Sequence, residues 1–254
     1  MILPRTPSFR LDDKRALIAG ASSGIGFGCA VALAEAGAHV VLSARSPERL
    51  AEAVAAIRAQ GFSAETLVLD VANVEATEAA IARHGAFHVL VNSAGTARHG
   101  PAEDTAPADF DAVFALNVRG AYFLTRAVAK GLIAAGEPGS LINISSQMAH
   151  VGGIDRAVYS ATKHAVEGFT KSMAIEWGPK GIRVNTICPT FIRTPLTEQT
   201  FSRPDRVQWI KEKIKLGRLG RVEDIMAAVT YLASDASAMV TGTALMVDGG
   251  WTAD

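Results

Sequence analysis

The amino-acid sequence predicts an α/β protein with a doubly wound parallel sheet and helices on both faces. Short apolar runs rich in β-branched residues alternate along the chain with alanine-rich helical stretches. Most of the short runs are apolar on both faces, which is typical of strands covered from each side. A glycine-rich turn joins the first of these runs to the first helical stretch. Strand–helix–strand repetition of this kind gives right-handed crossovers and parallel strands.

The individual elements follow from the same patterns. In the first predicted helix, Ile25, Cys29 and Leu33 fall on one face. Gly61 ends the second helix, and the Gly178-Pro179 pair ends the fourth. The predicted strands are residues 16–19, 39–44, 65–70, 89–92, 141–145, 183–188 and 244–247. The predicted helices are residues 25–36, 50–60, 109–135 (one long, bent helix), 159–177 and 222–233.

The composition is that of an ordinary globular domain. A chain of 254 residues lies within the size range of single α/β domains. Apolar residues make up 49% of the chain and charged residues 20%, which excludes a disordered protein. Lys plus Arg total 25 and Asp plus Glu total 25, so the formal charge is zero. We therefore expect one domain over residues 1–254 and neither a nucleic-acid nor a membrane partner.

The apolar segment 16–44 does not predict a membrane span or a signal peptide. Glycines interrupt it before it reaches the length of continuous apolar helix that either would need. The two cysteines, Cys29 and Cys188, lie far apart and do not form the framework of a secreted disulfide protein. These observations favour a cytoplasmic protein.

One connection is longer than an ordinary loop. Residues 194–217 contain no predicted strand, carry mixed charge and include Pro195 and Pro204. Long insertions of this kind are often lids over a site, so this segment is a candidate substrate lid. A surface excursion with no role is the alternative.

The glycine turn has the spacing Gly20-x-x-x-Gly24-x-Gly26 between the first strand and the first helix. Glycines allow a tight turn and a close backbone approach, and the helix N-terminus offers free N–H groups to a pyrophosphate. The spacing differs from the general G-x-G-x-x-G pattern of dinucleotide sites. Glycines also end strands for steric reasons alone, but the position of this turn favours a dinucleotide site.

The residue after the second strand distinguishes between two dinucleotides. An acidic side chain there binds the ribose 2′-hydroxyl of NAD, whereas an arginine accommodates the 2′-phosphate of NADP. Here the strand is followed by Arg45, and no acidic residue is present at its end. The sequence therefore favours NADP(H) over NAD(H), with a solvated turn arginine as the alternative.

Tyr159 and Lys163 are candidate catalytic residues because they lie four positions apart on a predicted helix and share a face. Tyr122 and Tyr231 also have a charged residue four positions on, so spacing alone does not select Tyr159. Ser146 ends a predicted strand thirteen residues earlier, at the sheet edge where α/β proteins bind ligands. This context favours the group of Ser146, Tyr159 and Lys163.

These residue types suit the oxidation of an alcohol. A free phenol has a pKa of about 10, so a tyrosine that accepts a proton near neutral pH needs help. A lysine ammonium about 4 Å away is worth about 4 kcal/mol at an effective dielectric constant of 20, which is sufficient. The Ser146 hydroxyl would hold the substrate oxygen and stabilise the charge that builds on it.

With these motifs, nearly the whole chain resembles the short-chain dehydrogenase/reductase family, the single-domain type of about 250 residues. The matching segments are the glycine turn, Asp70-Val71, Asn92-Ser93-Ala94-Gly95, Asn117, the Ser146, Tyr159 and Lys163 set, and Val247-Asp248-Gly249-Gly250. Ala19 stands where Thr is usual, Ser93 where Asn is usual, and Thr190 where Gly usually follows Pro189.

The resemblance implies a Rossmann-like domain with a seven-stranded sheet that binds the coenzyme and carries the catalytic residues, and commonly a homotetramer. It implies that Asn117 joins the catalytic set by helping to hold a water linked to Lys163. The coenzyme-binding residues that the turn and the resemblance together indicate are Gly20, Ser22, Ser23, Gly24, Ile25, Gly26, Arg45, Asp70, Val71, Asn92, Ala94, Gly95, Tyr159, Lys163, Pro189, Ile192 and Thr194.

The segment that joins Ser146 to Tyr159 must pass the substrate. Its polar side chains Gln147, His150 and Arg156 are candidate substrate contacts and suit a hydroxylated or anionic molecule. No metal site is expected: His84 and His88 are separated by Gly85 and have no cysteine nearby.

The leading hypothesis is an NADP(H)-dependent alcohol dehydrogenase or carbonyl reductase that acts on a secondary alcohol or ketone of a polar small molecule. One alternative enzyme is a sugar or polyol dehydrogenase that prefers NAD, and another is a two-domain sugar epimerase, which the glycine spacing disfavours. A regulator that binds the coenzyme without turnover is the alternative from another class. Such a regulator would not need the complete set of Ser146, Tyr159 and Lys163.

Overall fold

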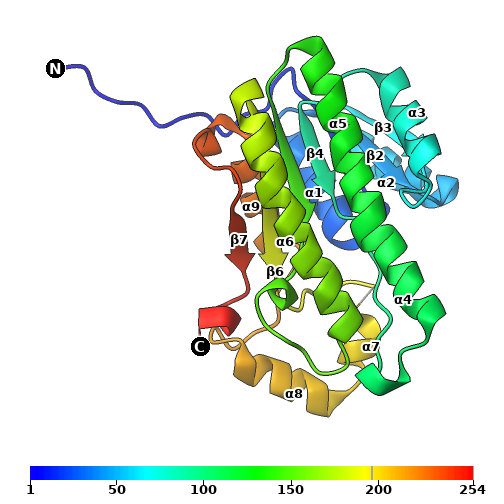
Figure 1. Cartoon of the computed structure of the whole chain (residues 1–254). Helices are drawn as coiled ribbons and strands as arrows, with labels where there is room; N and C mark the ends of the chain where they lie inside the picture. Colours follow the sequence, from blue (N-terminus) through cyan, green and yellow to red (C-terminus); the bar gives the residue numbers. More distant parts are fainter. Residues whose placement is uncertain (196, 254) are drawn as a thin grey trace.

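The computed structural model describes residues 1–195 and 197–253 and contains a seven-stranded sheet, in which every pair of neighbouring strands is parallel (Figure 1). The strand order is β3-β2-β1-β4-β5-β6-β7. The strands are β1 (Arg15–Ala19), β2 (His39–Ala44), β3 (Ala64–Val68), β4 (Val89–Asn92), β5 (Gly139–Ile144), β6 (Ile182–Pro189) and β7 (Ala244–Val247). The predicted parallel sheet is confirmed.

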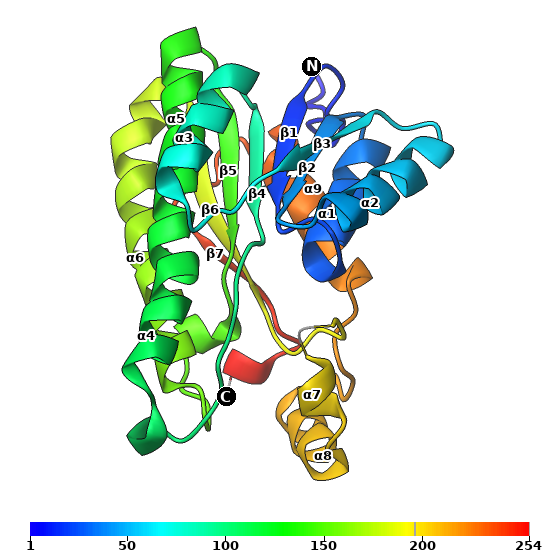
Figure 2. The same cartoon turned by 90° about the vertical axis from the view of Figure 1, so that its right-hand side faces the viewer.

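Helices cover both faces of this sheet (Figure 2). One layer consists of α1 (Gly24–Glu35), α2 (Pro47–Ala59) and α9 (Glu223–Ala233), and the other of α3 (Val74–His84), α4 (Pro107–Phe114), α5 (Ala121–Ala135) and α6 (Ala157–Trp177). Each layer buries its own apolar cluster against the sheet. The predicted doubly wound fold is therefore confirmed. Among the described residues, no helix combines the length and apolarity that crossing a membrane requires.

The strand order creates a crevice at one end of the sheet. β1 pairs with β2 on one side and with β4 on the other, so the chain reverses its direction of travel across the sheet there. In open α/β sheets, ligands bind outside the carboxyl ends of the strands at such a reversal. The turns that follow β1, β4, β5 and β6 lie at this end and carry most of the candidate residues.

Helix α3 was not predicted from the sequence. Its buried residues are Val74, Thr77, Ala80 and Ile81, so large apolar side chains make up only half of its buried face. The clear signal is Asn73, whose side-chain oxygen accepts a hydrogen bond from the Ala76 N–H and caps the helix. The preceding strand, predicted at 65–70, lies at Ala64–Val68.

The predicted helix 109–135 is continuous but contains a π-helical segment, η2 (Ala115–Gly120), between α4 and α5. Short π segments are rare and occur frequently at functional sites. Asn117 lies in this one, with its side chain buried.

The candidate lid contains the short helix α7 (Glu198–Phe201) and α8 (Pro204–Lys213). Figures 1 and 2 show both helices beyond the carboxyl ends of the strands, close to the end of β6. Leu196, within the predicted segment 194–217, lies outside the described residues.

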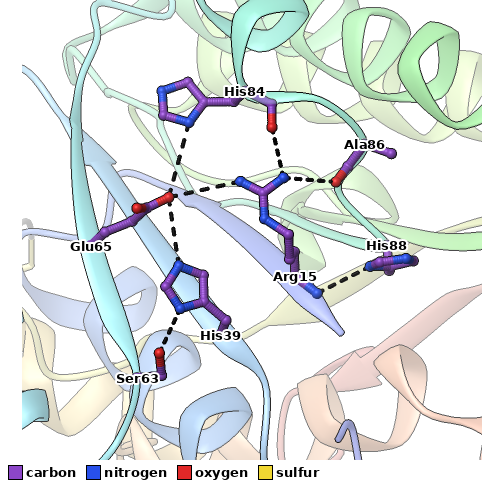
Figure 3. Close-up of polar contacts among 7 residues, drawn as sticks. All are labelled: Arg15, His39, Ser63, Glu65, His84, Ala86 and His88. Atoms are coloured by element: carbon purple, nitrogen blue, oxygen red, sulfur yellow. Dashed lines mark hydrogen bonds and ion pairs between the residues drawn. The ribbon is translucent and has the colours of Figure 1, made fainter. Parts of the chain in front are cut away.

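A polar network joins the opposite ends of β1, β2 and β3, away from the crevice (Figure 3). Oε1 of Glu65 lies 3.8 Å from Arg15, 3.6 Å from His39 Nε2 and 4.0 Å from His84 Nδ1. The Arg15 backbone N–H donates to Nδ1 of His88, 3.1 Å away. Because His84 and His88 contact different parts of this network, they do not converge on one point.

Candidate active site

In the glycine turn after β1, Gly20 and Gly26 have no room for a side chain. Gly20 and Gly24 adopt φ values of +74° and +58°, which favour glycine. A Cβ atom on Gly26 would lie 2.3 Å from the Gly20 carbonyl oxygen, and one on Gly20 would lie 2.8 Å from the backbone nitrogen of Ala94. The turn therefore packs backbone against backbone and leaves its outer surface open to a ligand.

The N-terminus of α1 is free to bind an anion. Ser23, the N-cap residue, is extended and makes no side-chain capping hydrogen bond. The first turn contains no acidic residue. The N–H groups there lack intrahelical partners, and the helix dipole adds partial positive charge. These features suit the binding of a pyrophosphate group. The predicted coenzyme residues Ser22 and Ile25 flank the start of the helix.

The ends of β2 and β3 hold the next three predicted coenzyme residues. Arg45 directly follows β2, and its side chain is exposed. Asp70 is also exposed, and its Oδ1 accepts a hydrogen bond of 3.0 Å from the Ala72 N–H. Val71 is buried against Gly120. The carboxyl edge of the sheet thus presents both a cation and a carboxylate to solvent.

The remaining predicted coenzyme residues follow β4 and β6. Asn92, the last residue of β4, donates from its amide to Asn143 Oδ1 at 3.2 Å. Pro189 ends β6, and Ile192 is buried. The Thr194 side chain lies 3.4 Å from the point where a Cβ on Gly24 would stand. The start of the candidate lid therefore approaches the glycine turn.

Asn117 connects the loop after β4 to α6. Its Oδ1 accepts a 2.9 Å hydrogen bond from the Thr96 N–H, and its amide donates to the Thr96 carbonyl at 2.8 Å. The amide also lies 3.2 Å from Oγ1 of Thr162, the neighbour of Lys163. A Cβ on Gly95 would lie 3.4 Å from Asn117 Oδ1 and 4.0 Å from Lys163 Nζ. The structure thus brings Asn117, Gly95 and Lys163 together.

Lys163 is almost fully buried at the carboxyl end of β5. Its Nζ donates a 2.8 Å hydrogen bond to the Ile144 carbonyl and lies 5.6 Å from the centre of the Tyr159 ring. No carboxylate within the described residues forms an ion pair with this ammonium. The Lys163 charge therefore lies near the Tyr159 ring and is not neutralised by an acidic side chain of the described residues.

Ser146 and Tyr159 line the same pocket, which has a volume of about 80 Å³. Ser146 Oγ accepts a 3.1 Å hydrogen bond from the Met148 N–H, which leaves its own hydrogen free to point into the pocket. The neighbouring Ser145 is not among the lining residues. This pocket is smaller than the 300–1,000 Å³ typical of sites for drug-sized ligands.

Two of the three predicted substrate residues, Gln147 and Arg156, line this pocket. His150 does not, and its Nε2 instead lies 3.6 Å from Cys188 Sγ. His99 is a lining residue that the sequence analysis missed, and its ring meets Tyr159 edge to face at 6.2 Å. Although His99 is an exposed residue, partial burial of its ring and then the Arg156 charge lower its pKa to about 4. The signal for His99 was its position in the loop after β4, at the carboxyl edge of the sheet.

His150, Glu167 and Cys188 form the one group of metal-ligand side chains found among the described residues, with ligand atoms within 4.8 Å of one another. The thiol donates to Glu167 Oε1 at 3.3 Å, and Thr186 donates to Oε2 at 2.9 Å. Burial, followed by the Glu167 charge, raises the pKa of Cys188 to about 12, which disfavours the thiolate that a metal needs. Internal hydrogen bonds thus account for this cluster, and the absence of a metal stays a prediction.

A larger cavity, of about 480 Å³, lies beside the end of β7. It shares Thr190 with the smaller pocket, and its lining includes Ile214 and Met246 but neither Ser146 nor Tyr159. This cavity therefore adjoins the smaller pocket but does not contain the catalytic candidates Ser146 and Tyr159.

The doubly wound sheet, the uncapped N-terminus of α1 and the pocket at the carboxyl edge of the sheet are the features expected of a dinucleotide-dependent oxidoreductase. Comparison with known proteins gives the family. A family model described as Enoyl-(Acyl carrier protein) reductase matches residues 20–252. The chain belongs to the short-chain dehydrogenase/reductase family, and it is an enzyme of the NAD(P)-dependent alcohol dehydrogenase and carbonyl reductase type.

Individual relatives align over almost their whole length. The chain is 41% identical over 250 residues to D-threitol dehydrogenase from Mycolicibacterium smegmatis, covering 96% of this chain and 95% of the relative. It is 39% identical over 248 residues to gluconate 5-dehydrogenase from Gluconobacter oxydans, covering 96% of each. The crystal structure of a gluconate 5-dehydrogenase from Burkholderia cenocepacia J2315 in complex with NADP and tartrate superimposes with a TM-score of 0.93 at 39% identity, covering 97% of this chain and 98% of that one.

Proposed function

We propose that this protein catalyses the reversible, NADP(H)-dependent oxidation of a secondary alcohol in a short, polyhydroxylated molecule. The observation that carries the proposal is that Ser146 and Tyr159 line one small pocket with the Lys163 ammonium buried beside the tyrosine. The glycine turn and the uncapped N-terminus of α1 supply the coenzyme site.

Four side chains have separate roles in the reaction. Ser146 donates a hydrogen bond to the substrate oxygen and stabilises the negative charge that develops there. Tyr159 accepts the hydroxyl proton as the C–H bond breaks, and in the reverse direction it returns that proton to the carbonyl oxygen. Lys163 stabilises the phenolate through its positive charge, while Asn117 holds the backbone beside it. One alcohol thus gives one ketone, one hydride and one proton.

The nicotinamide coenzyme, when bound, accepts that hydride or donates it in the reverse reaction. We assign the pyrophosphate to the glycine turn, the 2′-phosphate to Arg45 and the adenine to Asp70 and Val71. The residues assigned to the ribose and the nicotinamide are Asn92, Ala94, Gly95, Tyr159, Lys163, Pro189, Ile192 and Thr194.

The lining of the pocket supports a hydroxylated substrate. Gln147 is 1% exposed, and neither its amide oxygen nor its amide nitrogen has a hydrogen-bond partner among the described residues. Buried polar groups normally have partners, because an unpaired one costs about 1–3 kcal/mol. A substrate hydroxyl can donate to one atom of this amide and accept from the other. The relatives named for threitol and gluconate act on molecules of this kind.

The preference for NADP(H) depends on Arg45. We expect Arg45→Asp to lower the ratio of kcat/KM with NADP⁺ to kcat/KM with NAD⁺ by about 100-fold. The change removes a charged hydrogen bond worth about 1.5–3 kcal/mol and adds repulsion. Steady-state kinetics with both coenzymes measures the ratio. Lys130→Glu, a charge reversal on the exposed face of α5, is the control that leaves it unchanged. A wild-type enzyme that strongly prefers NAD⁺ would favour the alternative of an NAD-dependent sugar or polyol dehydrogenase.

The proposed function as a whole is tested by turnover. The purified protein is screened with both coenzymes against alditols, aldonates, simple secondary alcohols and the corresponding ketones, and the absorbance of the reduced coenzyme is followed. We expect turnover of polyhydroxylated compounds of up to six carbons and little activity on long apolar alcohols. Coenzyme binding without turnover of any compound would support the non-catalytic regulator instead.

Three further features belong to the proposal. We propose that residues 194–217 close over the substrate, since Thr194 adjoins the glycine turn and Thr197 and Thr200 line the pocket. We propose a homotetramer, as in the family, which sedimentation velocity would test. We also propose a cytoplasmic location, which cell fractionation would test.

A further inference from the structure

The pocket that contains Ser146 and Tyr159 carries a positive charge with no negative partner in its lining. Arg156 is the permanently charged residue there, and the described lining includes no Asp or Glu. His99, the other basic side chain, is neutral near pH 7 because its pKa lies at about 4. The pocket therefore presents one net positive charge to a substrate.

The Arg156 guanidinium makes few contacts with the protein. Its closest polar partner is Thr200 Oγ1 at 3.5 Å, which is long for a hydrogen bond, and its Cζ lies 5.6 Å from the centre of the Phe191 ring. Within residues 1–195 and 197–253 it forms no ion pair. The adjacent Asp155 is already paired with Arg206, with a nitrogen–oxygen distance of 2.8 Å.

Leaving this cation partly buried and unpaired is unfavourable. Burial lowers the pKa of Arg156, because the surrounding protein replaces part of the water that would solvate the charge. A buried charge is ordinarily paired with an opposite charge. The missing partner is therefore expected to come from a ligand.

The local backbone directs Arg156 toward the reacting group. Asp155 adopts a left-handed φ of +60°, which turns the chain sharply just before α6. Arg156 is the N-cap residue of that helix, and its carbonyl accepts the Ser160 N–H at 2.8 Å. A Cβ on Gly153 would lie 3.0 Å from Arg156 Cγ, so the side-chain stem rests against this glycine. Tyr159 follows three residues later, and its side chain lines the same pocket as that of Arg156.

We propose that Arg156 binds a substrate carboxylate, and that the preferred substrates are short polyhydroxy carboxylates rather than neutral polyols. This inference rests on the proposed function, since it assigns a substrate class to the same site. The planar guanidinium matches a carboxylate through two parallel hydrogen bonds. Its place beside Tyr159 lets one short molecule present its carboxylate to Arg156 and its carbinol to Tyr159 and Ser146.

The test compares substrates that differ only in the charged group. D-Gluconate is compared with D-glucitol, and D-threonate with D-threitol, each with NADP⁺, for the wild type, Arg156→Met and Arg156→Lys. We expect wild-type kcat/KM to be at least about tenfold higher for each aldonate than for its alditol, and Arg156→Met to lose about 100-fold on the aldonates only. Arg156→Lys, which keeps the charge, should retain part of the preference. Arg83→Met, on the exposed surface of α3, is the control that keeps the wild-type ratios.

Two results would overturn the inference while leaving the oxidoreductase function intact. One is an alditol preference that Arg156→Met does not change. The other is a higher kcat/KM for D-glucitol 6-phosphate than for gluconate, which would assign Arg156 to a phosphate group. If no alcohol is turned over, the proposed function fails, and the inference is then decided by calorimetry with succinate in the presence of NADP⁺. Binding to the wild type but not to Arg156→Met supports a carboxylate site, and equal binding to both rejects it.

Discussion

Tyr159→Phe is expected to lower kcat on the order of 10³-fold while coenzyme binding changes little. The substitution removes one oxygen atom and keeps the ring, so the edge contact with His99 and the 5.6 Å separation from Lys163 Nζ can persist. A positioned acid or base contributes roughly 10²–10⁴-fold to a rate, and here no other described lining residue can take its place. The imidazole of His99, whose ring meets that of Tyr159 edge to face, is a poor base because its pKa is lowered to about 4. Initial rates with the best alcohol give kcat, and NADPH fluorescence gives the coenzyme dissociation constant.

Tyr122→Phe is the matched control, because Tyr122 also has a basic residue, Arg126, four positions on. Its ring packs edge to face against Phe169 at 5.6 Å on the surface of α5, away from the pocket. We expect wild-type kcat and coenzyme affinity for this variant. A Tyr159→Phe enzyme that retains more than about a tenth of wild-type kcat would refute the assignment of the proton to Tyr159.

The parts of the fold that the sequence predicted best are those governed by burial. Strands such as β1, β4 and β5 are covered on both faces, so most of their residues are apolar and their positions are clear. α3 was missed because only two of its buried residues, Val74 and Ile81, are large and apolar, while Thr77 and Ala80 between them are polar or small. Periodicity of large apolar residues is a strong signal only where a helix buries such residues.

The parts of the site that could not be predicted depend on contacts between distant segments. The π segment at Asn117 is held by hydrogen bonds to Thr96, which is twenty-one residues away, and no local propensity encodes it. His150 was a reasonable candidate by position, but the 3₁₀ turn η3 (Gln147–Ala149) ends just before it, and its ring faces Cys188. The path of the loop after β4 likewise brings His99 to Tyr159.

Gly26→Ala is expected to weaken coenzyme binding by about 100-fold and to lower the melting temperature by several degrees. The new Cβ would stand 2.3 Å from the Gly20 carbonyl oxygen, well inside van der Waals contact. Gly20 cannot move away from the new methyl group, because its other side packs closely against the backbone of Ser93 and Ala94. The turn must therefore deform where it meets the pyrophosphate, and a 100-fold loss corresponds to about 2.7 kcal/mol. Titration of NADPH gives the affinity, and differential scanning calorimetry gives the melting temperature.

Gly168→Ala separates this steric effect from the general effect of adding a methyl group to a helical glycine. Gly168 lies within α6, and a Cβ there would meet no atom within 4 Å. Replacing a helical glycine by alanine favours the helix by about 1 kcal/mol, so this variant should be at least as stable as the wild type and bind NADPH equally well. A Gly26→Ala protein with wild-type affinity would mean that the coenzyme does not sit against this turn. The anion would then have to be held elsewhere, and the assignment of the N-terminus of α1 to the pyrophosphate would have to be abandoned.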